Sequence, residues 1–306
     1  MESSDDANRP GPIPGIPAPN SAFVFAAVLM IISVTLFTVS HGIVRGIGGE
    51  IHPFEIAFTT NLFSFVFFLP WLIRTRFRPM RTGKIRSHGV RAVFNVGAVC
   101  TWYFSLTLMP IADAVALSLM GPLVATLGAV LFLGERARTR RWVGMGIGVL
   151  GALLIIRPGF QSFNIGYAVV IVSLVCTAGS RLLTKKLTLS ESPAANGAWL
   201  ALMQIPISFT LALSVWQWPT PTQLVMMISI GLLAGAAYYT LTAAYARADV
   251  GALEPFNFIR LIIAALIGYL VFAEDIYIWT WAGGVVIVAS TTYVAHREAL
   301  KRQSAS

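Results

Sequence analysis

The chain carries very little charge. Only 11% of its 306 residues are Asp, Glu, Lys or Arg, whereas roughly a quarter of an average soluble protein is charged. The mean hydropathy is +0.74. Cysteine is also scarce, and Cys100 and Cys176 both fall within apolar runs, so neither a disulfide framework nor a cysteine metal site is indicated. The lack of charge excludes a soluble globular protein.

Histidine is equally scarce, with four in the chain. His52, His88 and His296 fall at the edges of apolar runs or between them, and only His41 falls within one. No pattern of paired acids, nucleophile and base, or metal ligands accompanies them. A membrane-embedded enzyme acting on a lipid-linked substrate is therefore only the alternative interpretation, and we expect no cofactor and no metal.

What the chain has in abundance is long apolar runs. Each is close to the length of about 20 residues needed to cross a hydrocarbon core. An acidic, proline-rich segment, 1–20, precedes them and is expected to be a disordered tail. We predict ten membrane-spanning helices, at about 21–44, 53–73, 90–109, 113–133, 142–157, 165–184, 196–217, 222–245, 250–273 and 276–295.

The basic residues alternate with these spans. Of 22 Lys and Arg, 19 fall in segments that the alternation places on one side, among them the whole stretch 74–91 with Arg91 at its end. Only Arg45 and Arg157 fall on the other side, and Arg260 lies within a span. The positive-inside rule then predicts a multi-pass protein of the cell (inner) membrane with both termini cytoplasmic. Such a distribution argues against binding to nucleic acid.

The sequence also repeats itself weakly. "LFLGE" at 131–135 recurs as "LVFAE" at 270–274, an offset of 139, and Tyr103 and Ala112-Asp113 recur as Tyr239 and Ala248-Asp249, an offset of 136. We expect an all-α membrane protein with two five-helix repeats, 21–157 and 165–297, and a tail at 298–306. Because five is odd, the second repeat is inverted, as in alternating-access transporters.

The same residues resemble a known family. "HPFEIAFTTNLF" in the second span, "PLVATLGAVLFLGE" in the fourth and "EPFNFIRLIIAALIGYLVFAE" in the ninth are similar to EamA-type members of the drug/metabolite transporter superfamily, over about 20–297. The resemblance implies ten helices in two inverted repeats and transport of a small organic solute. Similar sequences often carry an arginine where this chain has Thr60, so a substrate role of that arginine does not transfer.

The ninth span carries the most costly residue. Arg260 lies near the bilayer centre, where an arginine costs about 2.5–3.5 kcal/mol on insertion scales. Glu254, Asn257 and Arg260 are spaced three apart and form one stripe of the helix, which cannot face lipid. We predict that the Arg260 guanidinium binds a substrate carboxylate, phosphate or carbonyl, with Asn257 and Glu254 beside it. The alternative is a structural ion pair between Arg260 and Glu254.

Aromatic and polar residues of two further spans complete the predicted substrate site. They are Asn95, Trp102 and Tyr103 in the third span and Tyr238 and Tyr239 in the eighth. Aromatic walls beside an arginine suit a planar or amphiphilic solute, and core packing is the alternative for each of them.

Coupling and assembly are the last expectations. Glu254 and His41 are the candidate groups for proton coupling, with exchange for a counter-substrate as the other source of energy. Glycines at 144–151 and at 283–284 allow close helix packing, within the chain or in a homodimer. The sequence thus predicts a secondary transporter of a small metabolite or drug-like solute, with lipid and substrate as its partners.

Overall fold

The computed structural model describes residues 21–80, 82–121, 123–124, 127, 139–156, 164–188, 191, 193–245, 247, 253–275 and 277–303. Within these ranges the regular structure is entirely helical. The elements are α1 (Ser21–Ile47), α2 (Pro53–Arg74), η1 (Arg78–Met80), α3 (Ile85–Leu108), α4 (Ile111–Ser118), α6 (Thr139–Ile156), α7 (Ile165–Thr188), α8 (Pro193–Leu213), α9 (Pro221–Tyr245), η2 (Glu254–Phe258), α11 (Ile259–Phe272) and α12 (Ile278–Gln303). They follow the order of the ten predicted spans.

Four of these helices are long and apolar enough to cross a membrane, namely Phe23–Ile47, Pro53–Arg74, Ala195–Leu213 and Pro221–Leu241. Shorter apolar helical stretches lie at Trp142–Ile156, Ile165–Ser180, Phe256–Phe272 and Ile278–Ser290. The tail at 1–20 and most of the second half of the predicted fourth span lie outside the described residues.

Several helices begin where local chemistry favours a start. Pro53 occupies the first turn of α2, and His52 Nδ1 accepts a hydrogen bond from the Phe54 N–H at 3.2 Å. At the start of α9, the Gln223 N–H donates to the Thr220 hydroxyl and the Thr220 N–H donates to Gln223 Oε1 at 2.8 Å. This reciprocal pair is a capping box, which satisfies two of the N–H groups that a helix leaves unpaired.

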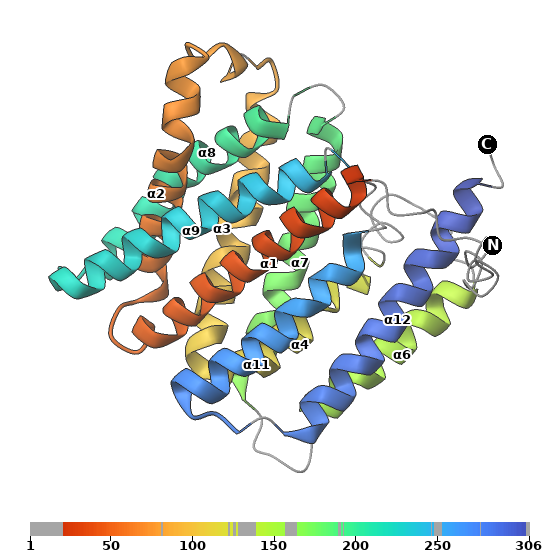
Figure 1. Cartoon of the computed structure of the whole chain (residues 1–306). Helices are drawn as coiled ribbons and strands as arrows, with labels where there is room; N and C mark the ends of the chain where they lie inside the picture. Colours follow the sequence, from red (N-terminus) through yellow and green to blue (C-terminus); the bar gives the residue numbers. More distant parts are fainter. Residues whose placement is uncertain are drawn as a thin grey trace, which may run out of the picture.

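The helices pack as a bundle in which α1 lies between α9 and α11 (Figure 1). The other extensive contacts are those of α3 with α7, α2 with α8 and α9, and α6 with α12. The glycines of α6 and α12 are used inside the chain. A Cβ on Gly151 would lie 2.9 Å from the Gly283 carbonyl oxygen and 2.8 Å from Ile287 Cγ1, so only glycine lets these two helices approach so closely.

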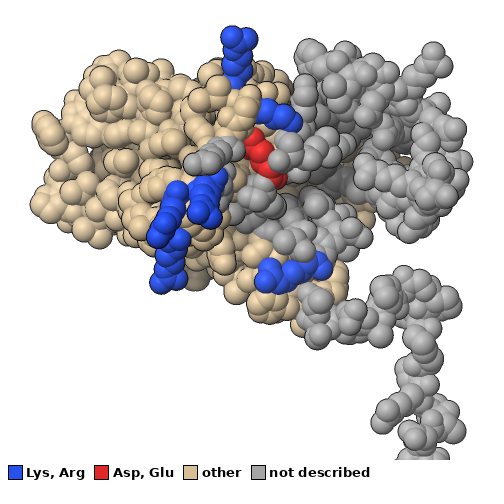
Figure 2. All heavy atoms as spheres, turned by 90° about the horizontal axis from the view of Figure 1, so that it is seen from above, with Lys and Arg blue, Asp and Glu red and all other residues tan. Residues whose placement is uncertain are grey.

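Basic side chains gather on one face of the bundle, which we call the termini face because α1 begins there and α12 ends there. Figure 2 shows the basic side chains gathered on the upper side of the molecule. Among the described side chains, the exposed Lys and Arg belong to the end of α2, the segment through η1 to the start of α3, and a residue that follows α9: Arg74, Arg76, Arg78, Lys84, Arg86 and Arg247. The prediction was wrong for Arg91, which was grouped with the loop residues. It lies inside α3 and is 2% exposed, because α3 begins at Ile85 and packs this face against α8.

Candidate functional site

Two interrupted helices meet in the middle of the bundle. Helix α4 ends at Ser118 and passes into turn residues, and α11 is preceded by the short 3-10 helix η2. The two helices pack against each other, and the Arg260 Nη2 of α11 donates a hydrogen bond to the Ser118 hydroxyl. In transporters, interrupted helices at corresponding places of two halves mark the substrate site. Ser118 and Glu254 are 136 residues apart, the offset of the weak sequence repeat.

A group of rings lies next to this junction. Phe37 and His41 are one turn apart on α1, and their rings stack at 6.3 Å between centroids. Trp102 of α3 meets His41 edge-on at 5.3 Å, and Tyr103 meets it at 6.5 Å. On the other side of Phe37, Tyr238 of α9 lies edge-on at 6.2 Å. The rings form a continuous aromatic row from α9 through α1 to α3.

The aromatic row lies near Arg260. Arg260 is close enough to His41 for the two side chains to interact electrostatically. Arg260, His41 and Trp102 are all partly exposed. The Trp102 indole N–H is nevertheless buried, and the described residues provide no hydrogen-bond partner for it. An unsatisfied buried donor costs about 1–3 kcal/mol, so this N–H is suited to receive an acceptor from a ligand.

The remaining predicted residues are placed differently. Asn95 donates to Gln204 at 2.7 Å and accepts from Ser180, and so links α3 to α8 and α7. Tyr239 is 56% exposed and lies against Phe67, away from the His41 rings. Asn257 is half-buried in η2. The side chain of Glu254 lies outside the described residues.

Tyr103 has a more buried position than a substrate-facing residue needs. It is 4% exposed, and its hydroxyl lies 3.4 Å from the Thr60 hydroxyl of α2. Thr60, 5% exposed, places a small hydroxyl beside this tyrosine. Tyr103 and Tyr239 occupy equivalent positions in the sequence repeat, yet one is buried and the other is exposed.

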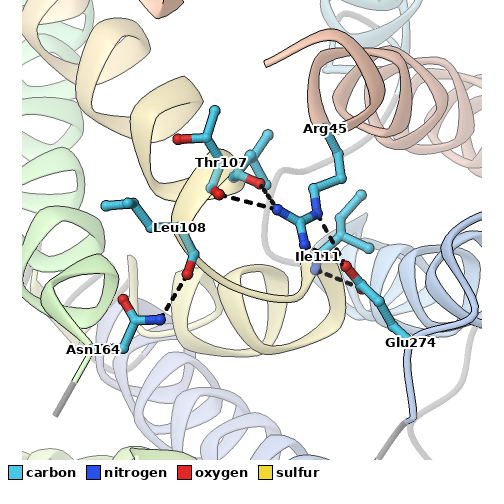
Figure 3. A network of polar contacts seen from close by, with 7 residues as sticks. Arg45, Thr107, Leu108, Ile111, Asn164 and Glu274 are labelled. Atoms are coloured by element: carbon cyan, nitrogen blue, oxygen red, sulfur yellow. Dashed lines mark hydrogen bonds and ion pairs between the residues drawn. The ribbon is translucent and has the colours of Figure 1, made fainter. Parts of the chain in front are cut away.

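One polar network that the sequence did not predict lies opposite the termini face (Figure 3). Arg45 of α1 forms an ion pair with Glu274 at 2.9 Å and donates to the carbonyl oxygens of Leu106 and Thr107 at 3.0 and 3.2 Å. Glu274 Oε2 accepts the Ile111 N–H at 3.1 Å. We call these five residues the Arg45 network. A cation thus lies at the C-terminal end of α3 and an anion at the N-terminal end of α4, where each is favoured by the helix dipole.

A second unpredicted group lies near the termini face, where α3 and α8 both begin. Arg91 Nη1 donates to the backbone and side-chain oxygens of Asn196, and the rings of His88 and Trp199 stack at 5.6 Å. We call His88, Arg91, Asn196 and Trp199 the α3–α8 cluster. The sequence signal for this group was the spacing of three residues on each helix, which places both residues of a pair on one helix face. It was missed because the basic residues resemble those of the neighbouring loop.

A protein-family comparison gives the decisive observation. The EamA-like transporter family model matches residues 22–157 and 164–295. The chain belongs to the EamA-like transporter family. As expected from the composition and the resemblance, this EamA-family chain is a multi-pass membrane protein, and its relatives are named as transporters and not as enzymes.

Two sets of EamA-family relatives carry names that specify a solute. The chain is 35% identical to a riboflavin transporter of Rhizobium johnstonii over 245 residues, 79% of this chain and 80% of that protein. It is 32% identical to a riboflavin transporter of Brucella anthropi, over 79% of this chain and 88% of that one. An S-adenosylmethionine uptake transporter of Rickettsia felis is 25% identical, over 82% and 86%.

A solved crystal structure has the same fold. It superposes with a TM-score of 0.63 and covers 92% of this chain and 99% of that chain, at 18% sequence identity. At that identity the likeness concerns the fold alone.

Proposed function

We propose that this EamA-family chain is a secondary active transporter that moves riboflavin, or a planar metabolite of similar chemistry, across the inner membrane by alternating access. The observation that carries the proposal is the junction of α4 and α11, where Arg260 bonds Ser118 beside the aromatic row. The riboflavin transporters among the relatives support the choice of solute.

The chemistry of the residues fits a flavin. The tricyclic ring of riboflavin is flat and apolar on its faces, and carbonyl oxygens and ring nitrogens along its edge accept hydrogen bonds. His41 and Trp102 offer aromatic surfaces for stacking, and the Trp102 N–H and the Arg260 guanidinium offer donors for the ring edge. Arg260 at the centre of the membrane is then the substrate-binding group.

The architecture proposed for this mechanism is a pair of inverted five-helix repeats, 21–157 and 165–297. Two features support it: the family model matches the chain twice, and α4 and the η2–α11 helix are both interrupted at equivalent positions. The basic residues of the termini face support cytoplasmic termini.

A second candidate solute is S-adenosylmethionine, the solute in the names of the Rickettsia relatives. The specific feature that favours it is again Arg260, because a guanidinium binds a carboxylate in a bidentate manner. A competition assay distinguishes the two solutes. Only the true substrate, added unlabelled at low concentration, inhibits the uptake of its own labelled form.

The deciding experiment uses proteoliposomes and labelled riboflavin. Arg260→Lys retains the charge but loses the planar fork, so we expect the KM to rise about tenfold or more with the melting temperature nearly unchanged. Arg260→Ala should abolish transport. Arg86→Lys, an exposed arginine of the termini face, is the matched control and should transport normally. Native transport by Arg260→Lys would reject the substrate role, and Arg260 would then be a residue that pairs helices.

Coupling is tested separately. If Glu254 couples transport to protons, Glu254→Gln should lose pH-driven uptake but retain counterflow exchange. His41→Gln gives the same test for the other candidate. Unaltered uptake across the pH range in both variants would favour exchange with a counter-substrate.

A further inference from the structure

The α3–α8 cluster contains an unusual number of buried polar atoms without partners. Among the described residues these are Arg91 Nε, Asn196 Nδ2, Trp199 Nε1 and His88 Nδ1. His88, Arg91 and Asn196 are at most 2% exposed. Each such atom costs about 1–3 kcal/mol when it is left unsatisfied, and buried polar groups in folded proteins are almost always paired. A cluster that served packing alone would not retain four of them.

Three of the four unpaired atoms are of one chemical kind, and the fourth, His88 Nδ1, donates or accepts according to the tautomer of the ring. Arg91 Nε, Asn196 Nδ2 and Trp199 Nε1 can only donate hydrogen bonds, so they can be satisfied only by an acceptor. The nearby carboxylate of Glu191 is already engaged, since one oxygen accepts from Thr82 and the other lies 2.7 Å from His88 Nε2. These three donor atoms therefore lack an acceptor among the described residues.

The local field favours a negatively charged acceptor. The contacts of Arg91 with Asn196 and of Asn95 with Gln204 show that α3 and α8 run in the same direction. Both helices begin near the cluster, at Ile85 and Pro193, so two N-terminal ends with their partial positive charge meet there. The Arg91 guanidinium adds a full positive charge. The Glu191 carboxylate, which interacts with Arg91 and lies 2.7 Å from His88 Nε2, offsets part of that charge.

We propose that the α3–α8 cluster is a second ligand site, separate from the Arg260 site, that binds an oxyanion: a phosphate or carboxylate group. Tyr238 lies between the two sites, because it is hydrogen-bonded to Arg91 and its ring meets Phe37 of the aromatic row. Because His88, Arg91 and Asn196 are at most 2% exposed, entry of the proposed oxyanion requires the first turns of α3 and α8 to part.

The test uses the full-length protein in nanodiscs of phosphatidylcholine, with inorganic phosphate as the probe. Melting temperature is followed during a phosphate titration at constant pH and ionic strength, with chloride as the reference anion. A bound ligand raises the melting temperature in a saturable manner, so we expect saturation with phosphate and none with chloride. The absence of a saturable phosphate effect would overturn the proposal.

The variant that decides the matter is Trp199→Phe, because it removes the indole N–H and leaves a ring to stack on His88. We expect phosphate affinity to fall about tenfold. Trp218→Phe changes a residue that is 88% exposed and should retain the affinity. Arg91→Lys should lose most of the phosphate response. If this variant does not fold, Trp199→Phe still decides the matter. Equal responses of Trp199→Phe and the unaltered protein would overturn the proposal.

Two further arms identify the source of the anion and separate this site from the transport site. In nanodiscs that contain phosphatidylglycerol, a weakened phosphate titration would identify a lipid headgroup as the source, and an unchanged titration would identify a soluble oxyanion. Arg260→Ala should abolish riboflavin uptake and retain the phosphate response. The loss of both together would reject a separate site.

Discussion

The Arg45 network and the α3–α8 cluster lie at opposite ends of α3. Each contains one arginine with a glutamate nearby: Glu274 belongs to the Arg45 network, and Glu191 lies beside the α3–α8 cluster. They differ in how completely their polar groups are satisfied. Arg45 and Glu274 leave no buried side-chain atom without a partner in the described part of the chain, whereas four atoms of the α3–α8 cluster lack one. Burial contributes to this contrast, because Arg91 is 2% exposed whereas the Arg45 side chain is 25% exposed and can reach solvent.

The comparison teaches that a membrane protein uses arginine in two ways. Arg45 donates hydrogen bonds to carbonyl groups at the end of α3 and forms an ion pair with the Glu274 carboxylate, so it links the two segments (Figure 3). Arg91 lies about two turns from the start of the same helix, and its Nε has no hydrogen-bond partner among the described residues. We infer a structural role for the satisfied Arg45 network, and the unsatisfied donors of the α3–α8 cluster are the observation on which the proposed binding role rests.

The largest expected effect comes from breaking the Arg45 network. Glu274→Ala removes the partner of Arg45 and the acceptor of the Ile111 N–H. Because the pair is only partly exposed, we expect a loss of about 2 kcal/mol in unfolding free energy, measured by thermal denaturation in detergent. Asp275→Ala, at the exposed neighbouring residue, is the control and should change stability by less than about 0.5 kcal/mol. Equal effects of the two variants would mean that the network contributes nothing.

In the α3–α8 cluster, we expect a substitution to raise the free energy of unfolding, the opposite of the effect of Glu274→Ala. Without ligand, Trp199→Phe removes an unpaired buried donor, so we expect the protein to be stabilised by about 1 kcal/mol. Thermal denaturation in phosphate-free buffer measures this. If Trp199→Phe were clearly destabilised, the indole N–H would have a hydrogen-bond partner in the membrane. The Arg45 network and the α3–α8 cluster would then no longer differ in how completely their polar atoms are satisfied.

A smaller stabilisation is expected next to the Arg45 network. Ala273, which ends α11 and leads into Glu274, has φ 50° and ψ 34°, in the left-handed region. A residue with a Cβ costs about 1–2 kcal/mol there, and glycine avoids that cost but loses more chain entropy. Ala273→Gly should therefore raise the unfolding free energy by about 0.5 kcal/mol. Ala273→Ser, at the same exposed position, keeps a Cβ and should therefore not raise the free energy of unfolding.

The smallest effect concerns pH. Burial lowers the pKa of His52 from its ordinary value of 6.5, so the folded state favours the neutral ring, whose Nδ1 caps α2. This contribution is present above pH 6.5 and is lost as the pH falls below it. We expect a loss of about 0.5 kcal/mol between pH 7.5 and pH 5. His52→Asn keeps a capping acceptor that does not titrate, so its melting temperature should lose less over the same range.

The course of the chain through the bundle could be predicted from apolar length and helix signals. Helices α2 and α9 begin at prolines close to the predicted boundaries, since Pro favours a first turn. The start of α3 was predicted at 90 but lies at Ile85. The error has a physical reason: Arg86, His88 and Arg91 resemble a solvated loop, and the burial of His88 and Arg91 depends on α8, about 105 residues further along the chain.

The sequence by itself determined the apolar helices, the gathering of basic residues on one face and the presence of an arginine within an apolar stretch. These follow from transfer free energy and helix periodicity, which act over a few neighbouring residues. Only the tertiary structure decided that Arg260 meets Ser118, that Arg45 meets Glu274 across 229 residues, and that Tyr103 is buried while Tyr239 is exposed. Contacts between helices that are distant in the chain depend on how whole surfaces pack, and no period in the sequence records them.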